Sequence, residues 1–142
     1  MADLAALRRL IQAHATDEST GIAGLSLSLA TSPTEPRSSI AWPIFALPVQ
    51  GLKRIIFNGR IYDYGAGDFL VVSVDLPITG QFLEASPDEP GLGVGLDLRP
   101  EVIAELILQA MTDQEESLPR AVPPIAVNRA SSALLNAVYR LL

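Results

Sequence analysis

The feature that most limits the fold of this chain is a series of short apolar runs between Gly21 and Leu98. Glycine, proline, asparagine or aspartate interrupts these runs about every ten residues, a spacing typical of the strands of a β-sandwich or barrel. With 142 residues the chain is long enough for one domain with a proper core. We therefore predict a single, mainly β (α+β) domain whose barrel occupies residues 21–98.

The strongest local signal is Asn58-Gly59, which separates the apolar runs 53–57 and 60–64. A type I′ turn requires a positive φ at both central residues, and asparagine and glycine tolerate this conformation best. A two-residue loop fixes the register of the two strands, so Arg54 is expected to face Asp63 as an opposite-charge pair. The sequence therefore predicts a hairpin at this point.

Two later runs also indicate strands. Residues 69–76 are almost entirely apolar, which favours a strand buried on both faces, and we expect Pro77 to end it. In Gly91–Leu98, leucine and valine on one face alternate with three glycines and an aspartate on the other. A bare glycine face indicates a close backbone neighbour, a bulge or space left for a ligand.

Apolar residues at helical spacing predict helices over 2–15, 100–111 and 130–142. The apolar stripe of the first helix consists of Leu4, Leu7, Ile11 and His14. Between the second and third helices, Thr112–Pro124 carries three acidic residues and three prolines. This linker is expected to be exposed and irregular.

Composition excludes several classes of function. The formal net charge is −6, which argues against a surface that follows nucleic-acid phosphates. Cysteine is absent, so the chain offers no disulfide, iron–sulfur cluster or thiol nucleophile. Its uncharged stretches are too short to span a bilayer, and the N-terminus lacks a secretory signal. We expect a cytoplasmic protein without a membrane partner.

Catalytic chemistry finds few candidate residues. Metal sites of small barrel enzymes use clustered histidines, but this chain has the single histidine His14, which belongs to the predicted N-terminal helix, away from any predicted strand pair. Paired carboxylates could be built from strand-associated acids, but structural roles explain these better. The acids are Asp63, Asp68, Asp75 and Glu84. We expect no catalytic residue, no metal and no cofactor.

The aromatic residues gather in the β region, where they could line a barrel interior that binds a small organic ligand. Three polar residues of the same region could supply hydrogen bonds to such a ligand. The opposite interpretation, that these aromatic side chains only fill the core, remains open. The predicted effector-binding residues are Trp42, Gln50, Tyr62, Phe69, Ser73, Phe82 and Glu84.

Several segments, in order over residues 21–107, carry a family resemblance. They are Gly21-Ile-Ala-Gly-Leu-Ser-Leu, Val49-Gln-Gly-Leu-Lys-Arg, residues 62–80 and Glu84-Ala-Ser-Pro-Asp-Glu-Pro, with Ser-Val-Asp-Leu-Pro-Ile-Thr-Gly at 73–80 the most distinctive. Together they resemble the N-terminal domain of AraC/XylS-type bacterial transcriptional regulators. The helix around Leu134–Leu142 resembles the segment that ends this domain.

The resemblance implies a cupin-like double-stranded β-helix, or jelly-roll barrel, with flanking N- and C-terminal helices. It also implies a domain that senses a small-molecule effector, often as a homodimer, and controls DNA binding by a C-terminal pair of helix-turn-helix motifs. We expect that DNA-binding domain to be absent from this chain, because no basic recognition helix follows the barrel.

For dimerisation we predict the apolar stripe of the last helix, although packing of this stripe on its own barrel remains equally open. The stripe consists of Leu134, Leu135, Val138, Leu141 and Leu142. Two other functions also remain open. A stand-alone cupin-like, metal-independent enzyme such as an isomerase or lyase would turn over a substrate, and a carbohydrate-binding module would expose its aromatic side chains on one surface.

Overall fold

The structure, a computed structural model, describes residues 3–14, 23–99, 101 and 124–142. Nearly all of the predicted helix over 100–111 and of the linker Thr112–Pro124 lies outside the described residues. The described elements, in chain order, are α1 (Leu4–His14), β1 (Leu25–Ala30), β2 (Arg37–Ala41), β3 (Ile44–Gln50), β4 (Leu52–Phe57), β5 (Arg60–Gly65), β6 (Asp68–Val72), β7 (Leu76–Glu84), β8 (Gly91–Asp97), β9 (Ile125–Arg129) and α3 (Ser132–Leu141).

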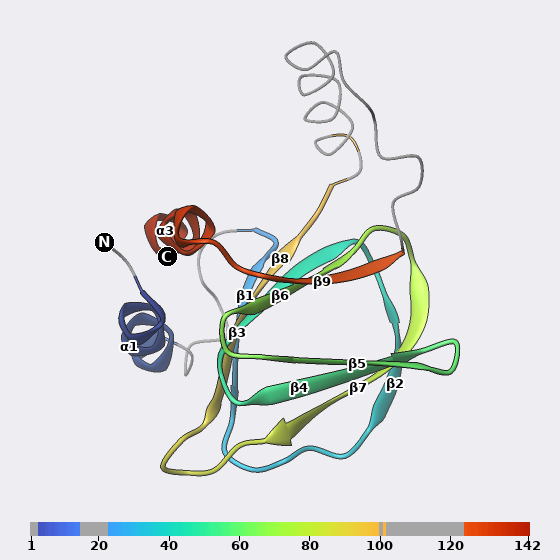
Figure 1. The fold of residues 1–142 in the computed structure, drawn as a ribbon, viewed down its shortest axis with the longest axis horizontal. Helices are drawn as coiled ribbons and strands as arrows, with labels where there is room; N and C mark the ends of the chain where they lie inside the picture. The colour runs from blue at the N-terminus through green and yellow to red at the C-terminus, as the bar shows by residue number, and fades with distance from the viewer. Residues whose placement is uncertain (1–2, 15–22, 100, 102–123) are drawn as a thin grey trace.

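The strands form two antiparallel sheets. One has the order β1-β8-β3-β6-β9 and the other the order β2-β7-β4-β5. The chain passes repeatedly from one sheet to the other, so the two sheets wind together as a double-stranded β-helix (Figure 1). The prediction of a mainly β, cupin-like barrel with helices near both ends is therefore confirmed.

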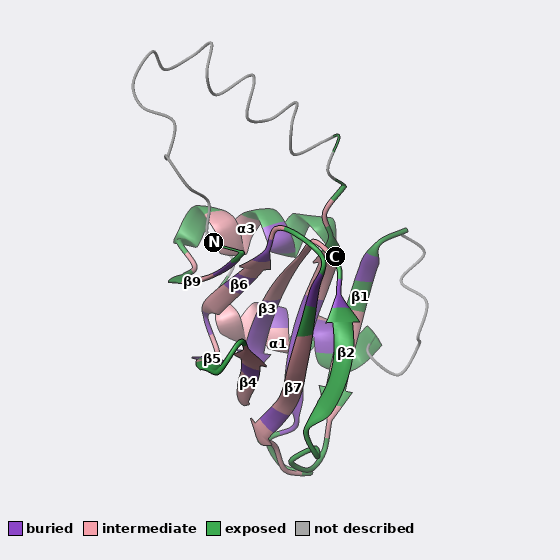
Figure 2. Ribbon diagram, turned by 90° about the vertical axis from the view of Figure 1, so that its right-hand side faces the viewer, coloured by how far each residue is buried: buried purple, intermediate pink, exposed green. Residues whose placement is uncertain are grey.

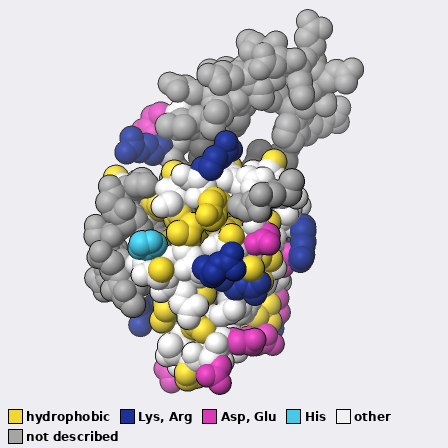
Figure 3. All heavy atoms as spheres, turned by 90° about the vertical axis from the view of Figure 1, so that its left-hand side faces the viewer, with side chains coloured by type: hydrophobic (Ala, Val, Ile, Leu, Met, Phe, Trp, Pro, Cys, Tyr) yellow, Lys and Arg dark blue, Asp and Glu magenta, His cyan; other side chains and the backbone are white. Residues whose placement is uncertain are grey.

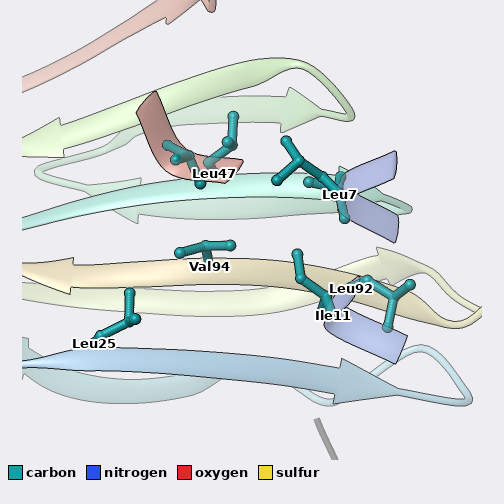
Figure 4. Packing of buried hydrophobic residues seen from close by; sticks show 8 residues of the cluster. Leu7, Ile11, Leu25, Leu47, Leu92 and Val94 are labelled. Atoms are coloured by element: carbon teal, nitrogen blue, oxygen red, sulfur yellow. The ribbon is translucent and has the colours of Figure 1, made fainter. Parts of the chain in front are cut away.

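Both helices cover the outer face of the five-stranded sheet (Figure 1). Leu7 and Ile11 of α1 are fully buried there, together with Val138 of α3. Figure 4 shows the two α1 side chains beside Leu25, Leu47, Leu92 and Val94 of the sheet. The prediction of an N-terminal helix is confirmed, but His14 is exposed, so the buried stripe ends at Ile11.

A second cluster of buried side chains fills the space between the two sheets. Its buried members are Ala41, Ile55, Tyr64, Leu70, Val72, Leu76 and Ile125. Because side chains alternate along a strand, each strand of the five-stranded sheet divides its residues between this interior and the helices. In β8, Leu92 and Val94 lie under the helices, and the glycines face the interior.

The hairpin has the predicted turn and register. Asn58 has a φ of 51° and Gly59 a φ of 77°, as the turn requires. Arg54 faces Asp63, and its Nε and Nη2 atoms donate hydrogen bonds of 2.7 and 2.8 Å to the carboxylate. Because the aspartate is held in this way, its pKa lies below the ordinary value.

The predicted strand over residues 69–76 is wrong in its extent. β6 ends at Val72, and Leu76 already begins β7. Pro77 lies inside β7, opposite Ile40 of the exposed edge strand β2 (Figure 2). The pairing of β7 with β4 begins only at Thr79, so in the described part of the chain Pro77 pairs with β2 alone, near the start of its strand, where proline is tolerated.

The predicted barrel boundary at residue 98 is also too early. Residues 125–129 form β9, which pairs with β6 from Val72↔Ile125 to Asp68↔Arg129. This strand extends the five-stranded sheet and leads directly into α3. Neither helix of the described part of the chain has the length and hydropathy needed to cross a membrane.

Candidate functional site

A cavity of about 770 Å³ lies against the inner face of the four-stranded sheet. Strands β4, β5 and β7 form one part of its wall, and the connection from β1 into β2 forms the other. The lining residues are Thr34, Glu35, Pro36, Arg37, Lys53, Arg54, Ile55, Tyr64, Ile78, Gly80, Gln81 and Phe82. An interior of this size accommodates a small organic molecule.

Lys53 lies at the centre of the sheet wall. It occupies β4, directly opposite Tyr64 of β5 on one side and Phe82 of β7 on the other. The Lys53 Nζ atom lies 5.0 Å from the centroid of the Phe82 ring and 6.0 Å from that of the Tyr64 ring. The ammonium group is therefore held over two aromatic faces, which attract a cation.

Burial perturbs both titratable groups of this wall. It lowers the pKa of Lys53, because the charged form is poorly solvated there, and it raises the pKa of the Tyr64 phenol. The ion pairs within the described part of the chain are Arg54–Asp63 and Arg129–Asp68. Neither involves Lys53, so among the described residues no carboxylate lies within ion-pair distance of its ammonium.

Hydrogen bonds fasten the opposite wall to β7. The Thr34 backbone N–H donates to the Phe82 carbonyl oxygen at 3.0 Å, and the Phe82 N–H donates to Thr34 Oγ1 at 2.8 Å. The residues that follow, Glu35 and Arg37, are exposed and place one charge of each sign at the cavity mouth. The inner part of the cavity thus combines apolar side chains with the Lys53 ammonium, and its entrance is polar.

Two glycines decide how much room the cavity has. A Cβ atom on Gly91 would lie 2.6 Å from the nearest atom of the Phe82 ring, so the bare backbone of β8 is what lets this ring lie where it does. At Gly80 a Cβ atom would lie 3.9 Å from the nearest atoms of Arg54 and Ile55, an ordinary van der Waals contact, so it fits without moving a neighbour. At Gly91, therefore, the glycine face of β8 accommodates a close neighbour, the Phe82 ring.

Of the predicted effector-binding residues, Phe82 lines the cavity. Trp42 is 55% exposed, and its Nε1 donates to the Asp97 carboxylate at 2.7 Å. Phe69 points to the helical side of the sheet, where its ring centroid lies 5.6 Å from that of Phe45. These two aromatic residues therefore lie outside the barrel interior.

The other predicted residues also have places apart from the cavity lining. Gln50 donates from Nε2 to the Pro90 carbonyl oxygen at 2.8 Å and so holds the connection between β7 and β8. Tyr62 is half-buried and packs against the interior core. Ser73 is half-buried just after β6, and Glu84 is exposed at the end of β7.

Sequence reasoning missed Lys53, although a signal for it was present. It is the only lysine of the chain. Once the hairpin register is known, strand alternation places it on the same face as Ile55, which is buried. A lysine at an inward position next to buried apolar residues is unusual and is a recognisable sign of a binding site.

The residues predicted for dimerisation are divided by the structure. Val138 is buried, and Leu134, Leu135 and Leu142 pack against the core beneath the helices. Leu141 is 38% exposed, next to the exposed Tyr139. On this helical side of the molecule the exposed histidine is also visible (Figure 3).

The described residues contain no group of three or more potential metal ligands.

The family model for the N-terminus of AraC-type transcriptional regulators matches residues 21–142. The chain belongs to this family. The resemblance found in the sequence is thereby confirmed, and the cavity described above is a feature of an AraC-type N-terminal domain. No curated protein is detectably similar to the chain in sequence.

Solved structures of ToxT share the fold of this AraC-type domain. ToxT from Vibrio cholerae O395 is 8% identical, with a TM-score of 0.54 over 84% of this chain and 45% of ToxT. The apo K231A variant from strain SCE256 is 4% identical, with a TM-score of 0.52 over 84% of this chain and 47% of the variant. The chain therefore spans about half the length of these ToxT proteins.

A third ToxT structure was solved with (E)-4-(8-methylnaphthalen-1-yl)but-3-enoic acid bound. It is 8% identical to this chain, with a TM-score of 0.52 over 81% of this chain and 46% of ToxT. At such identities the likeness concerns the fold alone.

Proposed function

We propose that this chain is the effector-binding regulatory domain of an AraC-type transcription regulator and has no catalytic activity of its own. The observation that carries the proposal is the half-open cavity of about 770 Å³ against the inner face of the four-stranded sheet, in a domain of this family. A ToxT protein with the same fold binds a small organic acid, which supports the interpretation of the cavity as an effector site.

In this proposal the domain acts by a shift of populations. An effector that binds better to one arrangement of barrel and helices increases the share of molecules in that arrangement. The domain forms a homodimer through the exposed surface of α3 around Leu141. A helix-turn-helix domain on the C-terminal side of this chain then binds DNA according to how the dimer presents it.

The proposal is tested by thermal unfolding in the presence of a chemically mixed panel of small metabolites, including neutral sugars, amines and carboxylates. A ligand at about 100 times its dissociation constant stabilises the folded state by about 2.7 kcal/mol, an easily measured shift in melting temperature. We expect at least one such shift in the wild-type protein. Its absence throughout the panel contradicts the proposal.

A pair of variants on β7 locates the binding. Gly80→Val adds a side chain to the cavity wall at a position where a new Cβ fits, since its nearest atoms would lie 3.9 Å away. Thr79→Val introduces the same side chain at the preceding residue, which by strand alternation lies on the opposite face of the sheet. We expect Gly80→Val to weaken the effect of the ligand and Thr79→Val to preserve it. A shift that survives in Gly80→Val places the ligand elsewhere.

A further inference from the structure

Within the proposed function, on which this inference rests, the chemistry of the cavity also limits the kind of effector. We infer that the effector is a small apolar monoanion, best satisfied by a carboxylate, whose acidic group pairs with Lys53 Nζ while its body lies against Phe82, Ile55 and Ile78.

The first argument is the uncompensated charge of Lys53. Lys53 is half-buried, and cations partly removed from water are normally paired with an anion, because loss of solvation is costly. The ion pairs of the described residues do not include Lys53, and its Nζ contacts only ring faces, at 5.0 and 6.0 Å from the centroids. An ammonium carries three N–H donors, and the faces of two rings do not satisfy them.

The second argument is the position of this ammonium beside empty space. Lys53 is itself a lining residue of the cavity, as are both rings that flank it. A carboxylate that enters the cavity can therefore accept hydrogen bonds from Nζ without displacing any side chain of the wall. Hydrogen bonds between an ammonium and a carboxylate are about twice as strong as neutral ones.

The third argument concerns the rest of the ligand. Next to Lys53 the inner wall is formed by Ile55, Ile78 and the Phe82 ring, and at Gly80 it carries no side chain. This surface favours an apolar body. The unpaired Lys53 ammonium matches one negative charge, and at the mouth the charges of Glu35 and Arg37 offset each other.

The test compares three apolar acids of different shape with their primary amides: octanoate, 4-phenylbutyrate and 2-naphthoate. Each amide has the size of its acid but carries no charge. By calorimetric titration we expect at least one acid to bind wild-type protein about tenfold or more tightly than its amide, as a charge-assisted hydrogen bond predicts. Equal binding of acid and amide in all three pairs overturns the inference.

Three variants assign this preference to Lys53. Lys53→Met keeps the length of the side chain without its charge and should abolish the preference for the acid, whereas Lys53→Arg should retain most of it. Arg60→Met, at an exposed position, removes one positive charge away from the cavity and should change nothing. A preference that persists in Lys53→Met overturns the inference.

A spectroscopic signal makes the test independent of affinity. Because Lys53 is the only lysine, labelling with [ε-¹³C]lysine gives a single lysine resonance. The acid should raise the pKa of Lys53, and the amide should leave this pKa unchanged.

The outcomes also separate this inference from the proposed function. If neutral members of the panel bind the cavity and acids have no advantage, the effector-binding function stands and the anionic effector is wrong. If neither the panel nor the six probes bind, both are wrong.

Discussion

At the scale of single residues, Gly91 determines the shape of the cavity through the Phe82 ring. The ring packs on the bare backbone of β8, and it is 8% exposed. A methyl group on Gly91 would lie 2.6 and 2.7 Å from two ring carbons, so the ring would have to move. Lys53 lies over this ring, and movement of the ring therefore also moves the surroundings of the ammonium.

We predict that Gly91→Ala lowers the free energy of unfolding by about 1–3 kcal/mol, as overpacking of a core does. The measurement is urea unfolding at neutral pH. Gly80→Ala is the matched control, because no atom there lies within 3.9 Å of the new Cβ. In the double variant Gly91→Ala with Phe82→Leu, most of the loss caused by the new methyl group should disappear. A loss of equal size on both backgrounds would contradict a contact with the ring.

Lys53 also makes the stability of the ligand-free domain depend on pH. Burial lowers its pKa in the folded state below the ordinary lysine value of 10.5. Between the two pKa values the unfolded chain binds more protons than the folded one, so the free energy of unfolding rises with pH in this window. The titratable or charged groups facing Lys53 are Tyr64 from β5 and, at the cavity mouth, Glu35 and Arg37.

Tyr64 has the opposite effect at higher pH. Its pKa is raised by burial, so the unfolded chain loses the phenol proton first, and stability falls as pH rises above about 10. We therefore predict that the free energy of unfolding rises measurably with pH below pH 10 because of Lys53. This rise should disappear in Lys53→Met and persist in Arg60→Met. The measurement is urea unfolding at a series of pH values. A rise of the same size in Lys53→Met would assign the effect to another group.

At the scale of helices and strands, the sequence predicts those elements whose conformation depends on neighbouring residues of the chain. The hairpin register followed from Asn58-Gly59, because the turn itself restricts the backbone there. The helix over Leu4–His14 followed from its apolar spacing. Its last predicted contact failed, since the burial of His14 depends on how far the sheet extends under the helix, and the pattern of one helix does not contain this information.

Elements that depend on distant partners were harder to predict. β9 has five residues directly after Pro123-Pro124, a run too short to distinguish a strand from the end of the linker, and it pairs with β6 over its whole length. Pro77 lies in β7 where β4 does not pair with it, and only the edge strand β2 is its neighbour among the described strands. The candidate site was difficult to predict for the same reason. Phe69 and Phe82 are both phenylalanines in apolar strand segments, but Phe69 faces the helices and Phe82 faces the cavity.

At the scale of the whole molecule, the cavity and the two helices belong to different sheets. The cavity lies on the inner face of the four-stranded sheet, whereas α1 and α3 lie on the outer face of the other sheet (Figure 1). Any effect of a ligand on α3 therefore has to cross the barrel. On the far side of the barrel β9 connects the five-stranded sheet to α3, because this strand pairs with β6 and ends two residues before Ser131, the N-cap of α3.

The surface of α3 then provides the test of the proposed dimer. Leu134, Leu135 and Val138 pack on the barrel, so a charge at these positions would unfold the domain as well as any dimer. Leu141 is 38% exposed and can be changed without opening the core. Burial of an unpaired glutamate in an interface is costly.

We predict that Leu141→Glu converts the domain from dimer to monomer while its thermal unfolding stays cooperative. The measurement is light scattering after gel filtration over a range of protein concentrations. Ser132→Glu, at the exposed opposite end of the helix, is the matched control and should remain dimeric. If Leu141→Glu keeps the dimer mass, the interface lies elsewhere, and the edge strand β2 with its 61% exposed Ile40 becomes the next surface to change. A wild-type domain that is monomeric at every concentration would contradict dimerisation through this chain altogether.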